Sequence, residues 1–164
     1  MVAKGKAMVR DPMQLRAYVV SHDDEIAIAQ GKYLWSAAQQ IGLTVGATFV
    51  NPRTQSESAE SAAAVTAFDP LPVITLPYGT PDDRWSSIIG ALPSLTDQLA
   101  VPAPMSVEVA ESTVKLFLPG FDKTQVKLTQ YGPEVTVEAG DQRHNVSLPP
   151  ALNGRAVTGA KFQS

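Results

Sequence analysis

The 164-residue chain contains no cysteine, which excludes disulfide bonds, a cysteine-ligated zinc site and a thiol nucleophile. Charged residues make up only 18% of it, and the net charge is -3, so we do not expect the basic surface of a nucleic-acid-binding protein. No apolar run reaches the roughly 18 residues of a membrane span. The basic start at residues 1–6 lacks the apolar segment of a signal peptide. These absences favour a soluble, cytoplasmic protein.

The first 100 residues alternate between strand-like and helix-like segments. Hydrophobic residues form 44% of the chain, which is enough for a core. Alternating strands and helices are typical of a parallel sheet with crossover helices. The predicted strands cover residues 15–20, 43–50 and 72–76, and the predicted helices cover residues 24–40, 59–68 and 81–99.

The first of these helices has recognisable ends and an apolar stripe. Ser21 and Asp24 are spaced as a capping pair, and Gly42 suits the carboxyl end. Trp35 and Trp85 lie on apolar helix faces, so we expect both in the core. In the last helix, Pro93 can introduce a kink. The predicted apolar stripe of the first helix contains Ile26, Ala29, Tyr33, Ala37 and Ile41, with Leu34 and Ala38 alongside.

The pattern changes after the Val-Pro-Ala-Pro segment at residues 101–104, which we interpret as a stiff linker. Between residues 107 and 148, apolar and polar residues alternate in five short segments. Turn residues around Gly120, Gly132 and Gly140 separate several of them. We therefore predict an α/β part over residues 1–100 and a β-sandwich of antiparallel strands over residues 105–164.

The β part resembles the α-crystallin domain of small heat-shock proteins. Residues 116–123 read Leu-Phe-Leu-Pro-Gly-Phe-Asp-Lys, and later strands end in a Leu-Pro step at Leu148 and Pro149. The resemblance covers about the last 60 residues. In that family a further strand closes the domain, and we expect it to be missing because the sequence stops at Ser164.

The first 100 residues resemble the carboxyl-terminal part of the ArsA-type ATPases. The resemblance is carried by the strand-helix unit of residues 15–41, the strand ending in Val50-Asn51, and the strand of residues 73–76 with its Pro77-Tyr78-Gly79 turn. That family includes arsenite-pump ATPases and the ATPase that delivers tail-anchored proteins to membranes, and it uses Mg-ATP. The combination with a small-heat-shock tail is similar to cyanobacterial and plastid members.

The sequence lacks the family's parts for phosphoryl transfer. A phosphate loop is absent, since Lys4-Gly5-Lys6 has neither the required spacing nor a preceding strand. The switch segments that hold magnesium and the attacking water are also absent. We therefore expect that this chain alone neither binds Mg-ATP nor hydrolyses it. Relative to the family it is shortened at both ends, as a fragment, a split subunit or a partial reading frame would be.

Three residues match the adenine side of the family's nucleotide site: Asn51, Pro77 and Tyr78. The resemblance implies that the Asn51 amide reads the adenine edge, for which a carboxamide has both a donor and an acceptor. Pro77 and Tyr78 match the loop beside the base. The alternative is that all three residues serve turns at strand ends.

Other polar residues have simpler explanations than catalysis. The acids at residues 23–25 and 82–83 suit helix starts. The serines of residues 56–61 have no base nearby and indicate a loop. His22 and His144 fall in different parts of a chain without cysteine, so we predict neither a metal site nor a catalytic triad.

The sequence favours a partial ArsA-type ATPase that serves protein targeting or an anion pump. One alternative is a non-catalytic, chaperone-like module that binds proteins through its β part. Another is a split subunit completed by a separate phosphate-loop chain. A small, incomplete sheet should leave an apolar face or edge for a protein partner or for self-association. The small-molecule cargo stays open.

Overall fold

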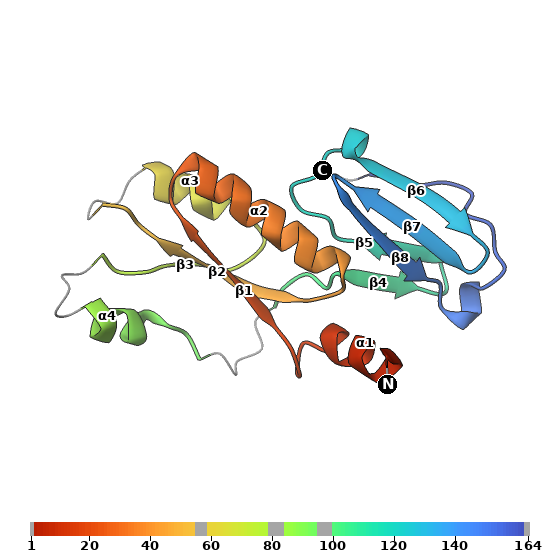
Figure 1. The fold of residues 1–164 in the computed structure, drawn as a ribbon, viewed down its shortest axis with the longest axis horizontal. Coiled ribbons are helices and arrows are strands. Elements are labelled where there is room, and N and C mark those ends of the chain that lie inside the picture. The colour runs from red at the N-terminus through yellow and green to blue at the C-terminus, as the bar shows by residue number, and fades with distance from the viewer. Residues whose placement is uncertain (1, 55–58, 79–83, 95–99, 163–164) are drawn as a thin grey trace.

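The computed structural model describes residues 2–54, 59–78, 84–94 and 100–162. It contains a three-stranded parallel sheet with helices, followed by antiparallel sheets (Figure 1). The predicted fold class is therefore confirmed. No helix in these ranges combines the length and hydrophobicity needed to cross a membrane.

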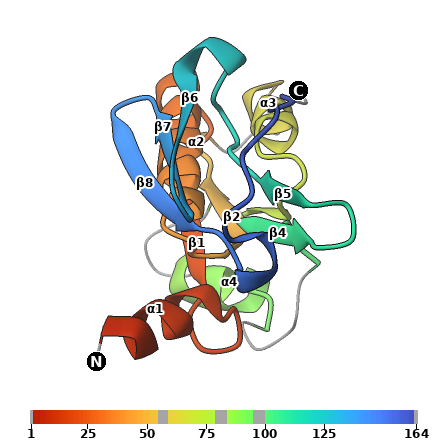
Figure 2. The ribbon, with the colours of Figure 1, turned by 90° about the vertical axis from the view of Figure 1, so that its right-hand side faces the viewer.

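The parallel sheet has the strand order β1-β2-β3. Helices α2 and α3 cover one side of it, and α4 lies on the other side (Figures 1 and 2). All three predicted strands and the predicted helix at 59–68 are confirmed, with ends shifted by a few residues. The bounds are Ala17–His22 for β1, Glu25–Gln40 for α2, Val45–Asn51 for β2, Ala59–Ala67 for α3 and Val73–Thr75 for β3.

Two helices differ from the prediction. Helix α1, Val2–Arg10, was not expected, because its first turn has no acidic residue. Helix α4, Arg84–Ala91, ends two residues before Pro93 rather than continuing to residue 99. The residue before a proline is disfavoured in helical conformation, so the helix stops there instead of kinking. Residues 79–83 and 95–99, where the predicted turn and the rest of that helix would fall, lie outside the described residues.

The core of the α/β part lies between the sheet and α2. Trp35 is 1% exposed and its ring lies 6.4 Å from that of Phe68, which is fully buried. Val19, Val45 and Leu71 complete the cluster. The prediction that Trp35 is a core residue is confirmed.

Most of the predicted apolar stripe of α2 faces solvent, although Ala38 packs against the core. Ile26 is 72% exposed and Ile41 is 55% exposed. The buried residues of α2 are Gly31, Trp35, Ser36, Gln39 and Gln40. Trp85 on α4 is also 72% exposed, so its predicted core position is wrong. The helix has apolar residues on more than one face, and the partners of Trp35 select the face that is buried.

The β part contains two antiparallel sheets, β4-β5 and β6-β7-β8. Gly120, Gly132 and Gly140 have positive φ angles of 79°, 55° and 60°, which confirms the predicted turns at these glycines. Beyond Leu152 the described residues form no helix or strand. The strands are Met105–Glu108 (β4), Thr113–Leu116 (β5), Val126–Tyr131 (β6), Glu134–Ala139 (β7) and Gln142–Ser147 (β8).

The β part packs against α2 through aromatic and polar contacts. The rings of Trp35 and Phe117 are 5.5 Å apart. The Tyr33 hydroxyl donates a hydrogen bond to Asp141 Oδ1 at 2.7 Å and accepts one from Gln142 Nε2 at 3.1 Å. Val101 also packs on the core of the α/β part. Figure 2 shows the two β sheets on either side of the carboxyl end of α2.

Candidate functional site

The carboxyl ends of the three parallel strands meet at one edge of the sheet. His22 at the end of β1 is paired with Asn51 at the end of β2. On the other side, the Leu76 N–H donates to the Val50 carbonyl at 2.8 Å. Pro77 and Tyr78 follow directly. The fold therefore brings the three candidate adenine-side residues to the same edge.

The exposure of these residues differs. Asn51 is half-buried, and its backbone carbonyl oxygen accepts a hydrogen bond from His22 Nδ1 at 2.9 Å. Pro77 is half-buried, whereas Tyr78 is 53% exposed. Gly79, which completes the quoted turn, lies outside the described residues. A carboxamide and an exposed aromatic ring at one edge can bind a flat heterocycle by hydrogen bonds and stacking.

Two carboxylates lie at the same edge, at the start of α2. Asp23 is 1% exposed; its Oδ1 accepts from the Arg53 N–H at 3.2 Å, and its buried Oδ2 has no partner among the described residues. Asp24 caps the helix, since its Oδ1 accepts from the Ala27 N–H at 3.0 Å. That hydrogen bond, assisted by the Arg53 guanidinium 3.4 Å away and by His22, lowers the pKa of Asp24.

The predicted capping pair of Ser21 and Asp24 is wrong, because Asp24 itself is the residue that caps α2. Ser21 belongs to β1, and its hydroxyl donates to the His22 carbonyl at 2.9 Å. The strand continues to His22, so the chain reaches Asp24 before it turns into the helix. Glu25 begins the helix, as expected of a helix-start acid.

Other residues considered as candidates do not assemble into a site in the part of the chain that the structure describes. No group of three or more His, Cys, Asp or Glu side chains there could hold a metal ion. His22 lies at the carboxyl edge, and His144 lines a cavity at the other end of α2. Asp82, Asp83, Ser56 and Ser58 lie outside the described residues, whereas Ser61 lies in α3 and not in the predicted loop.

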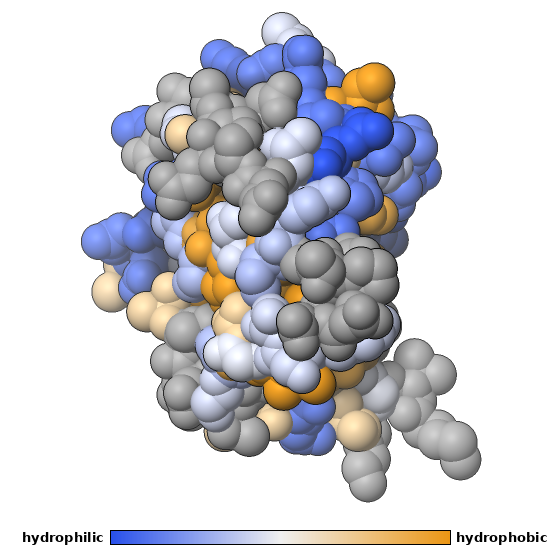
Figure 3. Space-filling model, turned by 90° about the vertical axis from the view of Figure 1, so that its left-hand side faces the viewer, coloured by the Kyte–Doolittle hydropathy of each residue, from blue (hydrophilic) through white to orange (hydrophobic). Residues whose placement is uncertain are grey.

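The surface around the carboxyl edge is mixed in polarity. The strands point to the left in Figure 1, and Figure 3 looks onto that side. Hydrophobic atoms gather near the middle of this face, between paler and hydrophilic atoms (Figure 3). Hydrophobic atoms of this kind can pack against the flat face of an aromatic ligand.

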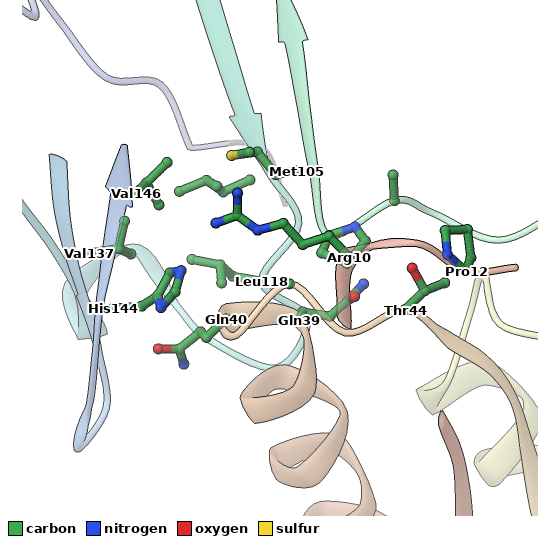
Figure 4. Close-up of a pocket in the computed structure, with 14 residues that line it drawn as sticks. Arg10, Pro12, Gln39, Gln40, Thr44, Met105, Leu118, Val137, His144 and Val146 are labelled. Atoms are coloured by element: carbon green, nitrogen blue, oxygen red, sulfur yellow. The ribbon is translucent and has the colours of Figure 1, made fainter. Parts of the chain in front are cut away.

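A cavity of about 280 Å³ lies at the opposite end of α2, between the α/β part and both β sheets (Figure 4). It is lined by residues from the ends of α1 and α2 and from both β sheets. These are Arg10, Pro12, Gln39, Gln40, Gly42, Thr44, Ala103, Pro104, Met105, Leu116, Leu118, Val137, His144 and Val146.

Sequence reasoning missed the polar lining of this cavity. Gln39 and Gln40 are 3% and 6% exposed, and their amide nitrogen and oxygen atoms have no partner among the described residues. Both follow buried residues, Trp35 and Ser36, by four positions and therefore share their helix face. That spacing was the available signal, but two glutamines near a helix end are more often exposed.

The β part also has a counterpart among known families. Residues 110–164 match the family model described as the HSP20-like domain found in ArsA. The match covers 55 of the 164 residues and includes strands β5 to β8. It confirms the small-heat-shock resemblance of this part of the chain. A search of curated proteins finds no match.

The match has a limited reach. It connects the chain to ArsA through an associated domain, and it does not extend into the parallel sheet. The ArsA-type assignment of residues 1–100, the cyanobacterial or plastid origin and the domain limits stay predictions.

Proposed function

We propose that this chain works as part of an ArsA-type ATPase, in which the carboxyl edge of the parallel sheet holds the adenine side of Mg-ATP. The observation that carries the proposal is the strand register, which gathers Asn51, Pro77 and Tyr78 at one edge. The ArsA-associated HSP20-like domain in the same chain supports it.

The chemistry of the edge suits a base better than a phosphate. The Asn51 carboxamide supplies the donor and the acceptor that complement adenine N7 and N6. The exposed Tyr78 ring offers a stacking surface.

Residues for the phosphates and magnesium are not found in the printed sequence, which contains no Gly-x-x-x-x-Gly-Lys-Ser/Thr segment. The residues present therefore fit the base and do not fit the metal. We expect that the 164-residue chain alone does not hydrolyse ATP, and that a separate phosphate loop completes the site.

Nuclear magnetic resonance titration tests the base site. Adenosine and Mg-ATP should bind with similar dissociation constants, on the order of 1 mM, because only the base is held. The Asn51→Ala variant should weaken both about tenfold, whereas the control Asn153→Ala, at an exposed position after Leu152, should not. Absence of any shift near Asn51 and Tyr78 at saturating adenosine would overturn the proposal. Micromolar Mg-ATP binding or steady hydrolysis would show that phosphate contacts exist elsewhere in the chain.

A second candidate is a subunit that functions only with a protein partner. The three-stranded sheet ends at β1, where Val20 is 66% exposed, and α4 exposes Trp85 and Ile89. These apolar side chains favour a partner chain with a phosphate loop that extends the sheet beyond β1. Co-purification of such a chain would support this candidate.

A further inference from the structure

We infer that the cavity at the carboxyl end of α2 binds a small amphipathic carboxylate, a monocarboxylic acid with an apolar tail. This inference is independent of the nucleotide proposal, because the cavity and the carboxyl edge lie at opposite ends of α2. Three features of the lining support it: apolar walls, buried amides and a guanidinium, the last two without partners among the described residues.

The apolar walls come from both β sheets. Met105 and Leu116 belong to the sheet β4-β5, and Leu118 follows it. Val137 and Val146 come from the neighbouring strands β7 and β8 (Figure 4). An aliphatic tail between these walls would leave water and gain the corresponding hydrophobic free energy.

The carboxamides of Gln39 and Gln40 form the polar part of the lining. Burial of polar groups without hydrogen bonds is costly, and unsatisfied groups are uncommon in native structures. Both side chains are more than nine-tenths buried, and all four amide nitrogen and oxygen atoms lack partners among the described residues. These four atoms are fully buried, so the two side chains rotate toward the cavity when their NH2 groups donate to a carboxylate bound there.

Arg10 adds a positive charge. Its side chain extends from the end of α1 into the cavity (Figure 4). It passes Gly42, where an added Cβ would lie 3.1 Å from Arg10 Cγ and 3.3 Å from Nε. Gly42 thus leaves room for the arginine. Arg10 has no ion pair within the described residues, and no Asp or Glu lines the cavity. An anion is therefore favoured over a cation or a neutral alcohol.

The volume also points to an organic ligand. A water occupies about 30 Å³ of liquid, so a cavity of about 280 Å³ has room for several waters. It falls near the lower end of the ~300–1,000 Å³ range for small-molecule sites. A short fatty acid such as octanoate is a suitable probe.

The test titrates the full chain with octanoate and follows the side-chain amide signals of its glutamines. Octanoate should bind saturably and shift the signals of Gln39 and Gln40. Octylammonium, with the same tail and the opposite charge, and acetate, with the same head and no tail, should each bind at least about tenfold more weakly. Equal binding of octylammonium, or no saturable binding of octanoate to folded protein, would overturn the inference.

Variants locate the binding. Arg10→Met should weaken octanoate about tenfold, and the fold should persist because Arg10 is exposed. The control Arg143→Met removes an exposed cation on β8 and should leave binding unchanged. Gln40→Leu, which replaces a buried amide by an apolar group, should also weaken octanoate. Unchanged binding in both Arg10→Met and Gln40→Leu would place octanoate elsewhere and reject the site.

Discussion

Gly31 allows α2 to lie close to the segment that follows α3. An added Cβ at this position would lie 2.7 Å from Phe68 Cζ and 3.4 Å from Val19 Cγ1. The Phe68 ring is fully buried and packs on Trp35, so it has little freedom to move away. The missing methyl group therefore allows this face of α2 to lie against Phe68.

Replacement of this glycine should destabilise the protein. Gly31→Ala should lower the free energy of unfolding by about 1–3 kcal/mol, because overpacking outweighs the gain in helix propensity. Urea unfolding followed by circular dichroism measures it. Gly90→Ala is the matched control on α4, where nothing lies within 4 Å of the added Cβ, and it should be neutral or slightly stabilising. A Gly31→Ala variant as stable as Gly90→Ala would contradict the packing described for Phe68.

Helix α2 connects the two candidate sites. It begins at the Asp24 cap beside the carboxyl edge and ends at Gln40 beside the cavity. The pKa of Asp24 is below its ordinary value of 3.8 because its carboxylate accepts the Ala27 N–H and lies near Arg53. A lowered folded-state pKa contributes stability above the unfolded-state pKa of about 3.9, and this contribution disappears as the pH falls through the folded-state value.

Substitution of Asp24 should separate capping from charge. Asn also caps helices but does not titrate, so Asp24→Asn should lose less stability than the wild type as the pH falls below about 4. Asp24→Ala removes the cap and should lower the melting temperature at neutral pH by a few degrees. Thermal unfolding at several pH values measures both effects. Glu111→Gln, at an exposed loop position, should keep the wild-type pH profile; an Asp24→Asn profile that matches it would contradict the assignment.

Strand patterns were more informative than helix patterns in this sequence. Most strands of the β part contain a short apolar-polar alternation between glycine turns, so their approximate positions could be predicted from local residues alone. In α2, apolar residues occur on several faces, and only contacts with distant residues such as Phe68 and Phe117 determine that Trp35 is buried and Ile26 is not. Local periodicity contains no information on those partners.

The same distinction applies to the two sites. Asn51 and Tyr78 follow neighbouring parallel strands, and strand order alone suffices to bring them together. The cavity could not be predicted, because its lining comes from elements far apart in the sequence. One of them, α1, has no acidic residue in its first turn to indicate where a helix begins.

The whole molecule exposes apolar surface where the parallel sheet stops. β1 pairs only with β2 among the described strands, and its sequence, Ala17–His22, has neither the lysine nor the proline that usually protects an edge strand. Val20 on this strand is 66% exposed, and α4 on the same side of the sheet exposes Trp85 and Ile89. Apolar surface of this kind is typical of an interaction site.

A charge at this edge should disrupt association. We expect the wild type to exceed the monomer mass in light scattering, because copies of the chain cover the edge in the absence of another partner. Val20→Lys should shift the mass toward the monomer, since burial of an unpaired ammonium is unfavourable. Ile26→Lys is the control at an equally exposed apolar position on α2, and it should leave the mass unchanged. A wild type that is monomeric at all concentrations would contradict the interpretation of this edge.

The length of α2 has a mechanical consequence. Its 16 residues form a helix with a length of about 24 Å. That span exceeds the screening distance of roughly 8–10 Å at physiological salt, so a charge that arrives at one end is not felt at the other through solvent. An effect of binding at one end on the other end would require α2 itself to tilt or slide. The hydrogen bonds that the Tyr33 hydroxyl makes with Asp141 and Gln142 would couple the β part to such a movement.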